Sequence, residues 1–234
     1  SICGETIDYG PCAFMNSYDP ATVFSSIDTQ GRYAFGNQAK IGHWNLYRFA
    51  EALLPLIHED QQQAIKAATE QLEHFPAIFL DYWLAGMRQK LGLFNQEADD
   101  LKLSEDLLTY MHNNNADYTN TFRALGKDEI KQMQIYHDHE FRNWLELWQA
   151  RLARQTQTPE QAYALMDQSN PAIIPRNHLV EEALTAAVND HDMKLVEKLI
   201  AITANPYNVD PTHIKYMQAP QPGFDNHYQT FCGT

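Results

Sequence analysis

The chain has 234 residues, 44% of them hydrophobic, which is enough for one sizeable core or two small ones. Its formal net charge of -13 argues against a nucleic-acid partner, because affinity for a phosphate backbone comes from clustered Lys and Arg. No apolar run approaches the roughly 20 residues that cross a bilayer, and the N-terminus lacks a signal-peptide pattern, so we expect a cytoplasmic protein without a membrane span.

Residues 1–38 predict an irregular leader, because turn-forming groups such as Tyr9-Gly10-Pro11 and Tyr18-Asp19-Pro20 recur there. Only residues 2–7 suggest a strand. We expect a helical body over 39–205 and an extended, Pro-rich tail over 206–234. The fold class is therefore mainly α.

Apolar residues recur at helical spacing from Gln38 onward. Asp60 and Thr158 are expected helix caps, and Gly92 an expected helix end. The aromatic residues of these helices are expected to pack in the core: Trp44, Phe79, Trp83, Trp144 and Trp148. The expected helices cover 41–58, 61–72, 76–91, 97–112, 118–125, 137–155, a segment from 159, 175–189 and 191–203.

Asp8-Tyr9-Gly10 is the strongest chemical motif. It is similar to the Asp-Phe-Gly element of kinase-fold enzymes, whose Asp holds the magnesium that bridges nucleotide phosphates. The chain has no Gly-rich phosphate loop, and only seven residues precede Asp8, so the partner groups of such a site are not in this sequence. On the motif alone, a turn-forming Asp explains these residues equally well.

Two polar clusters are weaker candidates. His137 and Glu140 have a spacing that suits metal ligands on a helix, but a polar helix start explains them better. Arg176-Asn177-His178 stands at a helix start that could attract an anion, and a capped helix is the preferred interpretation.

The chain as a whole resembles the selenoprotein O family of kinase-fold protein adenylyltransferases. Thr6-Ile7-Asp8-Tyr9-Gly10-Pro11 is the hallmark of that family. Further similar stretches follow in order: Tyr18-Asp19-Pro20, Gly31-Arg32-Tyr33, Asn37-Gln38, Trp44-Asn45-Leu46, Met87-Arg88-Gln89-Lys90-Leu91-Gly92, Asp117-Tyr118-Thr119, Thr121-Phe122-Arg123, Asn170-Pro171, Arg176-Asn177, Asn205-Pro206 and Cys232-Gly233-Thr234.

The resemblance implies the helical C-lobe portion of a protein-kinase-like fold. Family members look about twice as long, so the nucleotide-binding lobe and the catalytic base would lie upstream of Ser1. The intact enzyme would use ATP with Mg²⁺ or Mn²⁺ to transfer AMP to Ser, Thr or Tyr hydroxyls of proteins. Asp8 would bind the metal and the nucleotide. The resemblance also implies that this chain alone is inactive and could dimerise through the surface that the missing lobe would cover.

The resemblance further implies a redox role for Cys232, which matches the position of selenocysteine or cysteine in the family. Its usual disulfide partner would fall in residues 22–26, where this sequence has no cysteine. Cys12 is the nearest substitute and Cys3 the second.

The residues by themselves are also compatible with two other functions. A kinase-fold phosphotransferase would carry the same Asp-Tyr-Gly element. A non-catalytic helical interaction module would fit the large helical body without a nucleotide loop.

Overall fold

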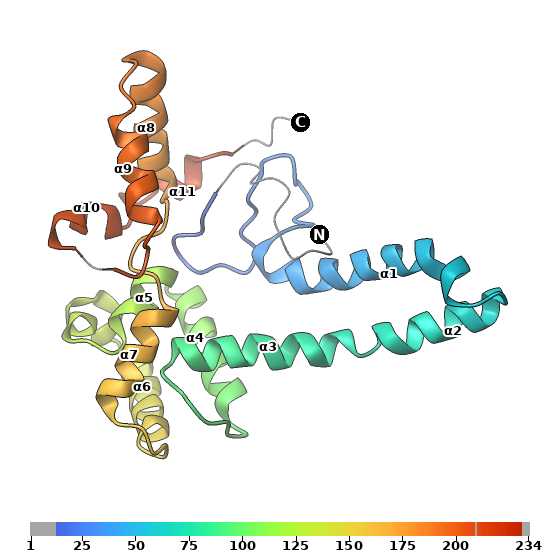
Figure 1. The fold of residues 1–234 in the computed structure, drawn as a ribbon. Coiled ribbons are helices and arrows are strands. Elements are labelled where there is room, and N and C mark those ends of the chain that lie inside the picture. The colour runs from blue at the N-terminus through green and yellow to red at the C-terminus, as the bar shows by residue number, and fades with distance from the viewer. Residues whose placement is uncertain (1–12, 209, 231–234) are drawn as a thin grey trace.

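A computed structural model describes residues 13–208 and 210–230 of the chain. These residues are mainly helical, as predicted, and contain no β-sheet, only an isolated bridge between Ser17 and Asp117. The predicted strand over residues 2–7 lies outside the described residues. A long arm of helices extends to the right of a packed body, and a second helical hairpin rises above that body (Figure 1). No described helix is both long and apolar enough to cross a membrane.

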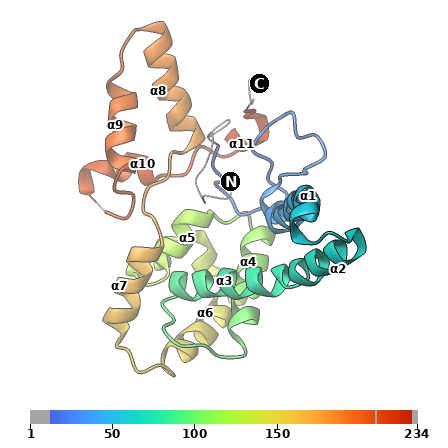
Figure 2. The same ribbon diagram turned by 45° about the vertical axis from the view of Figure 1, so that its right-hand side comes forward.

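The arm consists of α1 (Gln38–Ile57), α2 (Gln61–Leu72) and the first part of α3 (Phe75–Lys90), after a 3-10 turn at Phe35–Asn37. Two views show that α1 runs outward and that α2 and α3 run back alongside it toward the body (Figures 1 and 2). The predicted cap of α2 is confirmed, because the Asp60 carboxylate accepts a hydrogen bond from the Gln63 N–H at 2.9 Å. Gly92, with φ of 72°, ends α3 in the left-handed conformation that favours glycine.

The body contains α4 (Asp100–Asn113), α5 (Tyr118–Ala124), α6 (His139–Leu152) and α7 (Pro159–Ser169), with 3-10 turns at Asp128–Gln132 and Gln134–His137. Its core is a cluster of buried apolar side chains around Trp144 and Trp148. Each indole also donates a hydrogen bond, Trp148 to the Leu91 carbonyl at 2.9 Å and Trp144 to the Leu103 carbonyl at 2.8 Å. The capping box predicted at Thr158 is confirmed.

The second hairpin contains α8 (Asn177–Asn189) and α9 (Lys194–Thr203), packed over a smaller apolar cluster of their own. The predicted tail is only partly extended, because it forms a 3-10 turn at Pro211–His213 and two short helices, α10 (Ile214–Met217) and α11 (Phe224–His227). Pro211 begins a helical turn that Asp210 caps, by accepting from the Thr212 N–H at 2.8 Å. Among the described residues the tail therefore combines these short helical turns with the non-helical stretches that the sequence predicted.

The prediction of core aromatic residues holds in the body and fails on the arm. Trp144 and Trp148 are buried, and Trp83 packs against the body cluster. Trp44 is 45% exposed and Phe79 is 39% exposed. Their surroundings differ because α1 and the start of α3 project from the body, so only part of each helix is covered. The Arg32 guanidinium lies 4.4 Å from the Trp44 ring centre and covers one face of it.

A buried ion network anchors α4 to α3 and α6. The Arg151 Nε donates to the Asp100 carboxylate at 2.7 Å, and the Arg88 Nε donates to the same carboxylate at 2.7 Å. Burial raises the pKa of Asp100, but these hydrogen bonds outweigh it, so the pKa stays below its ordinary value. The carboxylate is therefore charged in the folded protein, with both guanidinium groups as counterions.

We predict that Asp100→Asn lowers the free energy of unfolding by about 3 kcal/mol, because it leaves the buried Arg151 guanidinium without its closest counterion. Urea unfolding followed by circular dichroism measures the change. Asp106→Asn on the same helix is the matched control, since Asp106 pairs with Lys102 at the surface and should contribute little. Equal effects of the two substitutions would contradict the prediction.

Candidate functional site

Most of the predicted site residues lie outside the described residues: Asp8, Cys3, Cys12 and Cys232. His137 ends a 3-10 turn, and the Glu140 N–H donates to the Asp138 carboxylate, which caps α6. Among the described residues, no three His, Cys, Asp or Glu side chains gather closely enough to hold a metal ion. The described chain begins at Ala13, three residues after Gly10 of the Asp-Tyr-Gly motif, and the candidate site lies around this first segment.

That segment, residues 13–18, is held between α5 and α8. The Phe14 N–H donates to the Asn177 side chain at 3.1 Å, and the Asn177 amide donates back to the Phe14 carbonyl at 3.0 Å. Further along, the Tyr18 N–H donates to the Ala116 carbonyl at 2.9 Å, and the Tyr118 N–H donates to the Asn16 carbonyl at 2.8 Å. Backbone hydrogen bonds on both sides thus fix the path of this segment.

The Arg176 side chain is buried at the centre of this arrangement. Its guanidinium donates to the Asp117 carboxylate at 2.7 and 3.2 Å, and to the Asn16 side-chain oxygen at 2.7 Å. It also donates to the side-chain oxygen of Asn120 at 3.1 Å and to the Met217 carbonyl at 3.3 Å. One side chain therefore connects the segment after the motif, the start of α5 and the tail.

The predicted helix cap at Arg176-Asn177-His178 was wrong, since no side chain caps α8. Arg176 precedes the helix and turns its side chain inward to Asp117, and Asn177 turns to Phe14. Burial and the adjacent Arg176 charge lower the pKa of His178, so its imidazole is neutral near pH 7. Arg176 and Asn177 therefore hold neighbouring segments of the site in place and do not cap the helix.

The tail closes the other side of the site. The Asn16 amide donates to the Asp225 carboxylate of α11 at 2.8 Å. The Thr230 hydroxyl donates to the Phe24 carbonyl at 2.7 Å, and the Ser26 N–H donates to the Thr230 carbonyl at 2.8 Å. The end of the described chain thus lies beside residues 24–26.

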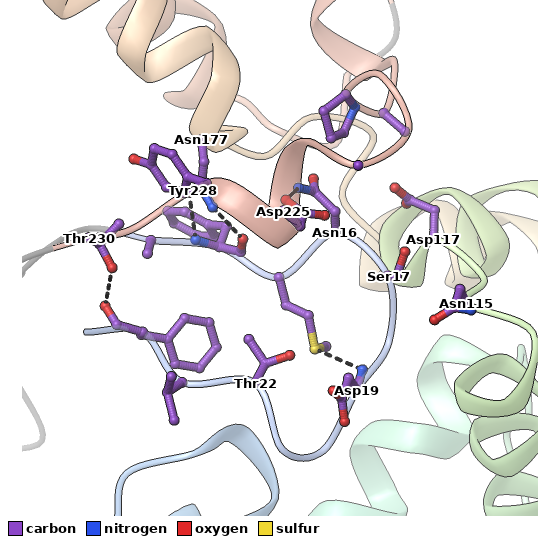
Figure 3. Close-up of a pocket in the computed structure, with 18 of the residues that line it drawn as sticks. Asn16, Ser17, Asp19, Thr22, Asn115, Asp117, Asn177, Asp225, Tyr228 and Thr230 are labelled. Atoms are coloured by element: carbon purple, nitrogen blue, oxygen red, sulfur yellow. Dashed lines mark hydrogen bonds between the residues drawn. The ribbon is translucent and has the colours of Figure 1, made fainter. Parts of the chain in front are cut away.

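These segments surround a cavity of about 810 Å³ (Figure 3). Its lining includes the carboxyl groups of Asp19, Asp117 and Asp225, and no Lys or Arg among the described residues that line it. Tyr228 also lines it and donates to Glu181 at 2.9 Å. Burial and this carboxylate raise the Tyr228 pKa to about 12, so the phenol stays neutral at physiological pH. The lining is polar, but Asp117 is paired with Arg176 and Asp225 accepts from the Asn16 amide, so these carboxylates already have partners within the fold.

Comparison with known proteins shows the family. The profile described as protein adenylyltransferase SelO matches residues 1–204. The chain belongs to the SelO family. It is 56% identical over all 234 residues to the protein nucleotidyltransferase YdiU of Halalkalibacterium halodurans, of which it covers 47%. It is 53% identical to the proteins of that name from Alkaliphilus metalliredigens and Anoxybacillus flavithermus, and covers 48% of each.

This SelO-family chain spans about half the length of the curated relatives it matches. The joint role of Asn16, Asp117 and Arg176 is not evident in the sequence. The cap at Asp117 was detectable locally, since Asp117 accepts from the Asn120 N–H at 2.8 Å. The contact of Arg176 with Asn16 spans 160 positions, and no local spacing indicates it.

We predict that Arg176→Met lowers the free energy of unfolding by about 3 kcal/mol, because it removes a buried cation and leaves Asp117 with an unpaired charge. Hydrogen exchange should also speed up at the amides of Tyr18 and Tyr118, which hold the segment after the motif. Arg142→Met, at an exposed position of α6, is the control. Unchanged exchange at both tyrosine amides would refute the organising role of Arg176.

Proposed function

We propose that this chain forms the C-terminal part of a metal-dependent protein adenylyltransferase that transfers AMP from ATP to Ser, Thr or Tyr hydroxyls of proteins. The main support for this proposal is the match to the SelO family over residues 1–204, which include Asp8-Tyr9-Gly10. The relatives' name, protein nucleotidyltransferase, supports the same class of reaction. The division into a leader over 1–38, a helical body over 39–205 and a tail over 206–234 is part of this proposal.

The proposed reaction conserves atoms and charge without a further reactant. The substrate hydroxyl oxygen bonds to the α-phosphorus of ATP, and the bond from that phosphorus to the oxygen bridging the β-phosphorus breaks. Pyrophosphate leaves, and the hydroxyl proton passes to a carboxylate that the family resemblance places upstream of Ser1. We therefore expect no transfer by this chain alone.

Asp8 is the proposed metal and nucleotide ligand. Bound Mg²⁺ or Mn²⁺ would neutralise phosphate charge. Among the described residues no three His, Cys, Asp or Glu side chains cluster as metal ligands. We therefore expect the remaining ligands in the part of the longer relatives that this sequence does not cover. The described residues would support this ligand, because Arg176 and Asn177 fix the segment that begins five residues after Asp8.

The role of the tail cysteine is also a proposal. We propose a redox pair between Cys232 and Cys12, with Cys3 as the alternative partner. Ala13 and Thr230, the described residues nearest in sequence to Cys12 and Cys232, both line the cavity of about 810 Å³. The ends of the described chain that lead to these two cysteines therefore reach the same cavity.

We further propose that the protein is cytoplasmic and that the isolated chain dimerises through the surface the missing part would cover. Sedimentation velocity over a range of concentrations measures this dimer.

We predict that this chain, joined to the upstream part of the Halalkalibacterium halodurans relative, labels proteins with phosphorus from the α position of ATP. Asp8→Ala should reduce labelling by at least about 100-fold, because it removes a ligand of the phosphate-binding metal. Asp106→Ala on the surface of α4 is the control and should keep full activity. Label from the γ position would indicate a phosphotransferase, and AMP transfer by the 234-residue chain alone would contradict the expected inactivity.

Peptide mapping of the oxidised chain should yield a Cys12–Cys232 peptide pair that disappears on reduction. Cys232→Ser should abolish the pair, and Cys3→Ser should leave it intact. If instead Cys3→Ser abolishes the disulfide to Cys232 and Cys12→Ser leaves it intact, Cys3 is the partner. Identical maps with and without reductant would exclude a disulfide.

A further inference from the structure

Helix α1 is apolar and yet uncovered. More than half of its 20 residues are apolar, and none of them is buried. Its principal packing partners are α2 and α3, which together with α1 form the arm that projects from the body (Figures 1 and 2). In the body, by comparison, α6 buries five of its residues, including both of its tryptophans. A long helix with this composition ordinarily covers its apolar side against another element.

One side of α1 is already occupied by the rest of the arm. The His43 ring stacks on Phe75 with ring centres 4.9 Å apart, and its Nε2 lies 2.9 Å from the Leu72 carbonyl oxygen. The Tyr47 ring lies 5.0 Å from His43 on the same side. The inner face of α1 is therefore defined by His43 and Tyr47.

A second apolar stripe runs along a different side of α1. It consists of Leu46, Phe49, Leu53 and Leu56, whose spacing of three, four and three residues aligns them along the helix. Leu46, Phe49 and Leu56 are exposed, Leu56 by 83%. Apolar side chains with this spacing form a seam along a helix. Such a seam packs against a second helix, and each side chain inserts between side chains of the partner. We call these four residues the α1 stripe.

The chemistry of α1 disfavours a membrane surface as its partner. Helices that lie on membranes carry Lys and Arg along their polar face. α1 has only Lys40 and Arg48, and Arg48 is paired with Glu51. Glu59 and Asp60 follow at its end. A helix of a protein fits the stripe better.

The length of the relatives identifies the occupant. The matching proteins are about twice as long as this chain, which covers 47 to 48% of them at 53 to 56% identity. A polypeptide of that length buries a larger fraction of its apolar surface than half of it can. We infer that the α1 stripe packs against a helix of the polypeptide that these relatives possess and this sequence lacks. This inference concerns the interface between the two halves and is independent of the chemistry they perform.

Hydroxyl-radical footprinting with mass spectrometry tests the inference. The two samples are this chain alone, at low concentration, and this chain joined to the missing part of the Halalkalibacterium halodurans relative. Labelling of Phe49 and Leu56 should fall about fivefold or more in the joined protein, because the core of a packed interface excludes water. Val188 and Ile200, exposed on α8 and α9, are internal controls that should label equally in both samples. The readout does not depend on AMP transfer.

Equal labelling of the stripe in both samples would overturn the inference. So would protection that is lost on dilution of the joined protein, because it would identify a second copy as the occupant.

As a second measurement, Phe49→Ser combined with Leu56→Ser should leave the urea midpoint of the isolated chain unchanged and lower that of the joined protein. Val188→Ser is the matched control and should lower neither. An equal shift of the midpoint in both proteins would also contradict the inference.

Discussion

The buried guanidinium of Arg176 is the interaction on which the arrangement of this chain depends. A guanidinium presents five donors in a rigid plane, and burial requires acceptors for them. Asn16, Asp117, Asn120 and Met217 supply acceptors for its two terminal nitrogens, from three separate parts of the sequence. Moving any of these segments would leave a charge or a polar group buried without a partner, so their positions are fixed together.

Two other buried arginines act in the same way elsewhere. Arg151 joins α6 to α4 through Asp100. Arg123 of α5 donates to the carbonyls of Asp167 and Asn170 at 2.9 Å each, and to the Tyr207 carbonyl at 3.2 Å. It therefore connects the body to the chain that leaves the second hairpin. Apolar burial supplies the main driving force for folding, whereas these directional contacts determine which segments meet.

Buried apolar side chains are concentrated in the body and in the second hairpin of this chain. The body packs around Trp144 and Trp148, and the second hairpin has a smaller cluster that includes Leu179 and Leu199. The arm has no comparable cluster, although α1 is rich in apolar residues. The stripe on the arm is therefore uncovered in this chain. The curated relatives are about twice as long, which agrees with a further segment that covers the stripe in them.

The sequence by itself determined the helices, several of their ends and the family. The caps at Asp60 and Thr158 could be predicted because each involves residues only three positions apart. Burial could not be predicted in this way, since Trp44 and Trp148 both recur at helical spacing and only Trp148 is buried. The surroundings of a helix depend on segments far away in the chain. The tertiary structure alone decided the contact of Arg176 with Asn16, because that pairing depends on shape and charge and not on sequence distance.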